Sequence, residues 1–234
     1  VLAEHHPEAQ CAFVAGSVMR GEGRPGSDID LVVLYDDQYQ TPHRDSFYWQ
    51  GTPVEVFAHC PKSLRFIFER ERQNGRPSMP HMIATGVVIG QNPALAQELQ
   101  QEAQALLAAG PNPLGDDERR HCIYMVSDAF DDLRDPRPQG QRLGILSHLY
   151  SALADLHLRT NGRWVGSSKH IIQRLHEFDP ALAAEYEAAF TAAFAGVDDR
   201  LFTLAERVLA PLGESVFAGY KQGYKQYMAP GWER

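Results

Sequence analysis

Two aspartates separated by one residue, Asp28 and Asp30, open the most apolar strand-like run of the sequence, DIDLVVLY. Residues two apart on a β-strand project from the same face, so these carboxylates point together while Ile29 and Leu31 point into a core. Two adjacent like charges repel, and burying them uncompensated is costly. Oxygen ligands without a nearby His or Cys favour Mg²⁺ or Mn²⁺ as the compensating ion. The alternative reading is an exposed strand end with a turn-capping aspartate.

A third acid and a glycine–serine pair fit the same chemistry. Glu55 lies between Val54 and Val56 in another strand-like run, which a neighbouring strand could bring beside the aspartates. A charged residue alternating with valines is equally ordinary on a solvated face. Upstream, Gly16 and Ser17 directly follow the apolar run CAFVA. A glycine there lets the backbone approach a phosphate, and the serine hydroxyl and backbone N–H groups can donate to its oxygens.

This combination resembles the nucleotidyltransferase superfamily that includes DNA polymerase beta and the aminoglycoside nucleotidyltransferases, and especially its small bacterial members. The resemblance covers residues 1–60. It implies that Gly16 and Ser17 hold the triphosphate of an NTP. It also implies that Asp28 and Asp30 ligate metal, with two Mg²⁺ ions expected and Mn²⁺ as an alternative, and that Glu55 ligates the catalytic ion. These three acids are therefore the expected catalytic and metal-binding residues.

Further candidates lie outside this set. Arg20, in the loop after Ser17, is either a phosphate contact or a surface arginine. Lys169, in the segment NGRWVGSSKH, is similar in context to a triphosphate-binding lysine of small-molecule nucleotidyltransferases. The acids Asp128, Asp131 and Asp132 lie on one predicted helix and could form an anionic wall for a polar acceptor carrying amines. A solvated helix face is the alternative for Lys169 and for the three aspartates.

The elements that position these residues are of two kinds. Strands are expected at 11–15, 28–35, 45–49, 53–58 and 85–90, and a helix is expected from Pro61. Helices are then expected at 93–109, 116–135, 142–160, 167–178, 180–195 and 198–209. The fold class is therefore α+β. The resemblance implies that residues 1–90 form a small mixed β-sheet nucleotidyltransferase domain, and the helical pattern predicts an all-helical bundle domain over residues 91–234. The aromatic residues near the carboxyl end, Tyr220, Tyr224, Tyr227 and Trp232, suggest a docking tail.

Composition narrows the function. The chain has 22 Lys+Arg against 30 Asp+Glu, a net charge of -8, and so lacks the basic footprint of a nucleic-acid-binding protein. No apolar run approaches the roughly 20 residues that span a bilayer, and no membrane partner or secretory signal is expected. The three cysteines, Cys11, Cys60 and Cys122, form no CxxC motif and suit a reducing, cytoplasmic location.

Three functions compete on this sequence. The first is an Mg²⁺-dependent enzyme that transfers a nucleoside monophosphate from an NTP, expected to be ATP, to a hydroxyl of a small molecule such as an aminoglycoside-like antibiotic, and releases pyrophosphate. The second is the same chemistry on a protein side chain, as in AMP-transferring, antitoxin-like relatives. The third is a non-catalytic nucleotide-binding module. The sequence leaves the acceptor, the base and the oligomeric state open.

Overall fold

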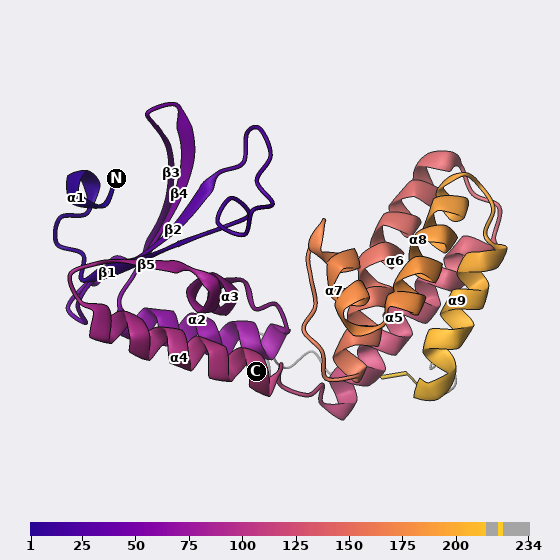
Figure 1. Ribbon diagram of the computed structural model, residues 1–234. Helices are drawn as coiled ribbons and strands as arrows, with labels where there is room; N and C mark the ends of the chain where they lie inside the picture. Colours follow the sequence, from indigo (N-terminus) through magenta and orange to yellow (C-terminus); the bar gives the residue numbers. More distant parts are fainter. Residues whose placement is uncertain (214–219, 222–234) are drawn as a thin grey trace, which may run out of the picture. The chain divides into compact units, whose positions relative to one another are not determined.

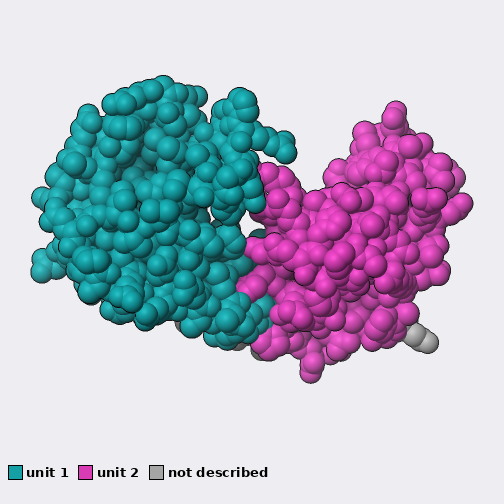
Figure 2. All heavy atoms as spheres, in the orientation of Figure 1, with its two compact units in different colours: residues 1–112 teal, residues 113–234 magenta. Residues whose placement is uncertain are grey.

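The chain folds into two compact units, each with its own core. The computed structural model describes residues 1–213, 220 and 221 (Figure 1). The units are Val1–Asn112 and Pro113–Arg234 (Figure 2). The first holds a mixed β-sheet and the second is helical, which confirms the predicted α+β class. Among the described residues, no helix is both long enough and apolar enough to cross a membrane.

A five-stranded sheet forms the centre of the first unit. Its strands lie in the order β3-β4-β2-β1-β5, with β2 and β4 parallel and every other neighbouring pair antiparallel. The three inner strands are rich in apolar and β-branched residues, which suit a position covered on both faces. The strands are β1 Cys11–Ala15, β2 Ile29–Leu34, β3 His43–Trp49, β4 Thr52–His59 and β5 Val87–Gly90.

Helices α2, α3 and α4 gather on one face of this sheet (Figure 1). Their apolar side chains form a core with alternate strand residues, among them Val32 and Leu34. The opposite face carries a smaller core that contains Leu31 and Val33. The alternation along β2 therefore decides which face each side chain joins. The helices of this unit are α1 Leu2–His5, α2 Pro61–Asn74, α3 Ser78–Thr85 and α4 Pro93–Ala109.

The second unit is a helical bundle around a single core. Large buried side chains from α6 and α8, among them Leu149, Leu153, Tyr186 and Phe190, fill its centre. Asp179 caps α8 by accepting a hydrogen bond from the Leu182 backbone N–H at 2.9 Å. The described elements are α5 Asp116–Arg134, α6 Gln139–Thr160, α7 His170–Phe178, α8 Pro180–Phe194, α9 Asp199–Leu209 and the 3-10 helix η1 Ala210–Leu212.

The structure differs from the sequence-based expectation at several elements, and the differences at α4, α3 and α7 are the most informative. Helix α4 packs into the sheet's core through Ala96, Leu99 and Ala103, so it belongs to the first unit, whereas the sequence pattern places it after the boundary at residue 90. Helix α3 was not predicted, because it is short and carries Pro80 in its first turn. Helix α7 begins at His170 rather than at residue 167, because Ser168 in the preceding turn has a left-handed backbone conformation with a φ of 50°.

The predicted docking tail lies almost wholly outside the described residues, which include none of Tyr224, Tyr227 and Trp232. Tyr220 is described: its ring stacks on Tyr124 with centroids 3.9 Å apart, and its hydroxyl lies 2.6 Å from Nδ1 of His121. This part of the tail therefore packs on α5 of its own chain.

Candidate active site

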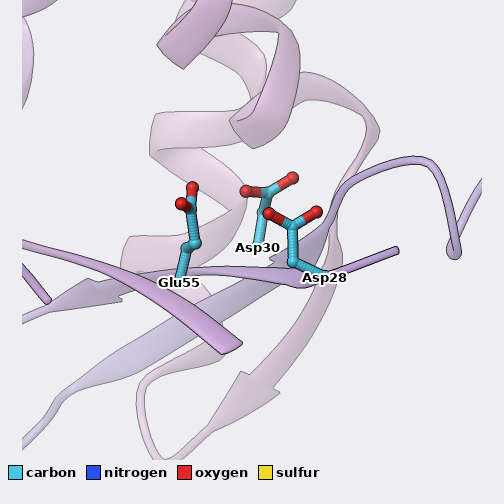
Figure 3. Close-up of side chains that lie close together, drawn as sticks. All are labelled: Asp28, Asp30 and Glu55. Atoms are coloured by element: carbon cyan, nitrogen blue, oxygen red, sulfur yellow. The ribbon is translucent and has the colours of Figure 1, made fainter. Parts of the chain in front are cut away.

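The register of the sheet brings the three predicted acids together. Asp30 on β2 is paired with Glu55 on the parallel neighbour β4, and Asp28 lies just before β2 begins. Each residue offers one carboxylate oxygen to a set whose members all lie within 4.8 Å of one another. Figure 3 shows the three side chains rising from the same side of the sheet. The convergence of Glu55 with the aspartates, expected from the sequence, is therefore present in the structure.

The face on which these carboxylates lie follows from the alternation along the strands. Asp30 shares its face of β2 with Val32 and Leu34, which are fully buried in the core under the helices. Glu55 shares its face of β4 with Phe57, which packs against that same core. The acids are only partly buried. The three acids therefore lie at the end of the buried, apolar face of the sheet, where their carboxylates are partly accessible to solvent.

The charges of this cluster interact strongly. Burial, and then the negative charges of Asp28 and Glu55, raise the pKa of the Asp30 carboxyl above its ordinary value, while Arg44 and Arg20 act in the opposite direction. Nη2 of Arg44 donates to Oε1 of Glu55 at 2.5 Å. The site thus holds three acids in one place with a nearby arginine as a partial counter-charge.

Gly16 brings the backbone against this cluster. The antiparallel pairing of β1 with β2 places Ala15 opposite Asp30, so Gly16 follows directly beside the aspartate. Its φ is +93°, a conformation that favours glycine. A Cβ at this position would lie 2.6 Å from Oδ2 of Asp30. A side chain at this position would therefore displace the Asp30 carboxylate.

Ser17 and Arg20 lie in the turn that follows Gly16. The Ser17 hydroxyl is 3.4 Å from the hydroxyl of Ser27, which accepts a hydrogen bond from the Arg24 backbone N–H at 2.9 Å. The contact between the two serines joins the two ends of the loop between β1 and β2. Arg20 is exposed and its Nε donates to Glu22 at 3.1 Å. Both residues lie in the loop next to the acids, and their predicted contacts with phosphate stay predictions.

The remaining candidates lie in the second unit. Lys169 is exposed and forms the N-cap position of α7. On α5, Asp131 forms an ion pair with Arg134 at 3.1 Å, and Asp132 forms one with Arg137. These pairs reduce the negative charge that the two aspartates offer to a substrate. The triphosphate contact of Lys169 and the acceptor contacts of Asp131, Asp132 and Asp128 stay predictions.

Arg44 is the residue of this site that the sequence reasoning missed. The predicted strand began at Asp45, but β3 begins at His43 and pairs with β4 around the tight turn at Gln50 and Gly51. That register places Ser46 opposite Glu55, and it carries Arg44 along the same face of β3. A register counted outward from the Gln50–Gly51 turn would have revealed this proximity.

The donor set fits a hard divalent cation. All the ligand atoms available from Asp28, Asp30 and Glu55 are carboxylate oxygens, which Mg²⁺ and Mn²⁺ prefer. The close approach of Gly16 to Asp30 also leaves no room for a side chain beside the carboxylate. The arrangement thus has the ligand chemistry that Mg²⁺ or Mn²⁺ requires, with a glycine backbone directly beside it.

The match to a family model agrees with this geometry. Residues 1–89 match the family model described as polymerase beta, nucleotidyltransferase. Among solved structures, a nucleotidyltransferase-like protein from Exiguobacterium sibiricum 255-15 is similar with a TM-score of 0.42 and 14% identity, over 91% of this chain and 77% of that one. No curated protein matches the sequence. The family model covers all the strands of the sheet except the last residue of β5.

Proposed function

Residues 1–89 belong to the nucleotidyltransferase superfamily, and from this premise we propose that the protein transfers a nucleoside monophosphate from an NTP, with ATP as the expected donor, to a hydroxyl of a small molecule. The observation that carries the proposal is the convergence of Asp28, Asp30 and Glu55 within 4.8 Å. In a site without a bound cation, three clustered negative charges repel one another and give no stabilisation that would account for their presence.

In this proposal Asp28, Asp30 and Glu55 hold two divalent ions, Mg²⁺ or Mn²⁺. When bound, these ions would neutralise charge on the triphosphate and lower the pKa of the acceptor hydroxyl. The reaction forms a bond between the acceptor oxygen and the α-phosphorus and breaks the bond from the α-phosphorus to the bridging oxygen. Pyrophosphate and a proton leave.

The chain's own groups would orient the nucleotide. The turn at Gly16 brings the backbone against Asp30 and Ser17 adds a hydroxyl, and in this proposal the backbone N–H groups of the turn and that hydroxyl donate to triphosphate oxygens. Arg20 adds a positive charge in the same loop. These groups supply position and charge neutralisation, which are the protein's main contributions to phosphoryl transfer.

The nature of the acceptor is part of the proposal. A net charge of -8 supports a small acceptor over a polyanionic one, and an acceptor rich in amines, such as an aminoglycoside-like compound, suits an acidic protein. The three cysteines are free thiols, which supports a reducing cytoplasmic location.

The test is a pyrophosphate-release assay with a panel of NTPs and acceptors in Mg²⁺, with the product identified by its mass shift. Asp28→Asn and Asp30→Asn should each lower turnover at least a hundredfold. Asp45→Asn is the matched control, because β3 residue Asp45 is opposite Val56 and leaves the sheet on the other face from Glu55.

Three results would redirect the proposal. Equal turnover by wild type and both aspartate variants would refute it. Labelling of a protein with AMP, without any small-molecule product, would favour a protein-modifying enzyme. Nucleotide binding by calorimetry with no pyrophosphate from any acceptor would favour a non-catalytic module.

A further inference from the structure

Arg44 lies on edge strand β3 beside the carboxylate cluster. Its guanidinium donates to Oε1 of Glu55 at 2.5 Å and lies over the ring of Phe57, with 5.2 Å between Cζ and the ring centroid. Residues Arg44 and Phe57 are paired across β3 and β4, so the aromatic ring supports the arginine from the neighbouring strand. Two separate contacts therefore fix the direction of this side chain.

The pair with Glu55 differs from an ordinary surface ion pair. The Arg44 side chain is 60% exposed, but that of Glu55 is only 23% exposed and lies next to Asp28 and Asp30. The hydrogen bond and charge of Glu55, with smaller contributions from the two aspartates, raise the pKa of Arg44 above its ordinary value. The positive charge of Arg44 thus interacts with all three acids of the cluster and not with Glu55 alone.

We propose that Arg44 is the internal counter-charge of this cluster, which stabilises the three acids when no cation is bound and competes with the divalent cation for Glu55. This inference rests on the proposed function, because it concerns the same carboxylates. Arg44 is here a positioning residue, which acts through Glu55.

The competition follows from charge and from ligand count. Three carboxylates with Arg44 carry two net negative charges, and without it they carry three, so the arginine lowers the attraction of the site for a cation. Glu55 also has only two oxygens, and Oε1 is held by Arg44. A unit positive charge a few ångström from a divalent ion, at a dielectric constant near that of water, weakens its binding by roughly tenfold at low salt.

The experiment compares the intact protein with Arg44→Gln, Arg44→Lys and Arg65→Gln. Arg65 is the matched control, since it is also a partly exposed arginine of the first unit, and its partners are Glu98 and Glu102 on α4. Mn²⁺ binding is measured by calorimetry at low salt without nucleotide. Thermal unfolding is measured with a chelator and again with Mn²⁺.

Arg44→Gln should bind Mn²⁺ about three- to tenfold more tightly than wild type and unfold at a lower temperature in chelator, with most of that loss restored by Mn²⁺. Arg44→Lys keeps the charge and should bind Mn²⁺ within about threefold of wild type. Arg65→Gln should leave the Mn²⁺ affinity unchanged. The lysine variant keeps the test open if the glutamine variant does not fold in chelator.

Unchanged or weaker Mn²⁺ binding by Arg44→Gln would overturn the inference while leaving the metal site intact. Equal tightening by Arg44→Lys and Arg44→Gln would also overturn it, because the charge would then not be responsible. If neither wild type nor Arg44→Gln binds Mn²⁺, the metal site itself is wrong, and both this inference and the proposed function fail.

Discussion

Gly16→Ala tests whether the backbone beside Asp30 is shaped for the site. Gly16 has a φ of +93°, and an alanine Cβ there would lie 2.6 Å from Oδ2 of Asp30. Gly26, in the same loop, has a φ of +89° and has nothing within 4 Å of the corresponding position. The two alanine variants therefore share the backbone strain, and only Gly16→Ala displaces the carboxylate.

The magnitudes follow from these contacts. An alanine at positive φ costs about 1–2 kcal/mol, so both variants should lose about that much unfolding free energy. An ordinary carbon–oxygen contact would require the Asp30 carboxylate to move by more than about half an ångström, whereas metal–ligand distances tolerate about 0.2 Å. Gly16→Ala should therefore lose about tenfold in Mn²⁺ affinity and about a hundredfold in turnover.

Denaturant unfolding, Mn²⁺ calorimetry and pyrophosphate release measure these three quantities on both variants. Gly26→Ala should keep Mn²⁺ affinity and turnover within about twofold of wild type, since a Cβ at Gly26 would contact nothing within 4 Å and would displace no carboxylate. The reasoning is refuted if Gly16→Ala binds Mn²⁺ as wild type does, or if Gly26→Ala loses as much affinity as Gly16→Ala.

Two further predictions concern stability. Asp30→Asn removes one of three clustered charges, so it should raise the unfolding temperature in chelator and abolish the stabilisation by Mn²⁺; a lower unfolding temperature in chelator would contradict this. Burial raises the pKa of Glu71, which accepts from the Met79 backbone N–H at 2.8 Å, to about 7. The folded state therefore keeps a proton that the unfolded state releases, so this contribution to the unfolding free energy is present at acid pH and is lost as pH rises through about 7. Urea unfolding between about pH 5 and pH 8 should show wild type losing about 1–2 kcal/mol relative to Glu71→Gln, and Glu69→Gln should follow wild type.

The acidic cluster could be predicted from strand alternation, which is local, together with the resemblance to nucleotidyltransferases, which selects Glu55. Alternation along β2 sets the direction of Asp28 and Asp30, and the parallel partner strand supplies an acid at the matching position, Glu55. Gly16 follows β1 at the place where the chain must turn. The periodicity of a strand and the order of residues along the chain can both be read from a single sequence, so these residues could be identified.

What could not be predicted depends on which elements pack together. Arg44 belongs to an exposed edge strand whose sequence HRDS has no apolar alternation, so its pairing with Glu55 appears only when the β3–β4 register is known. Helix α4 is amphipathic like the helices after it. Its buried residues, among them Ala96 and Leu99, would give the same sequence pattern whether the helix packed on a sheet or on other helices. Helix α3 is short and has Pro80 in its first turn, and a proline in a sequence usually argues against a helix at that position.

The central claim is that Asp28, Asp30 and Glu55 together bind a divalent cation. The most direct measurement is an anomalous difference map from crystals of the intact protein soaked with Mn²⁺ and a non-hydrolysable NTP. The account predicts a peak within about 2.0–2.3 Å of an oxygen from each carboxylate, with the triphosphate on the turn at Gly16. A map with nucleotide bound elsewhere and no Mn²⁺ between the acids would contradict it.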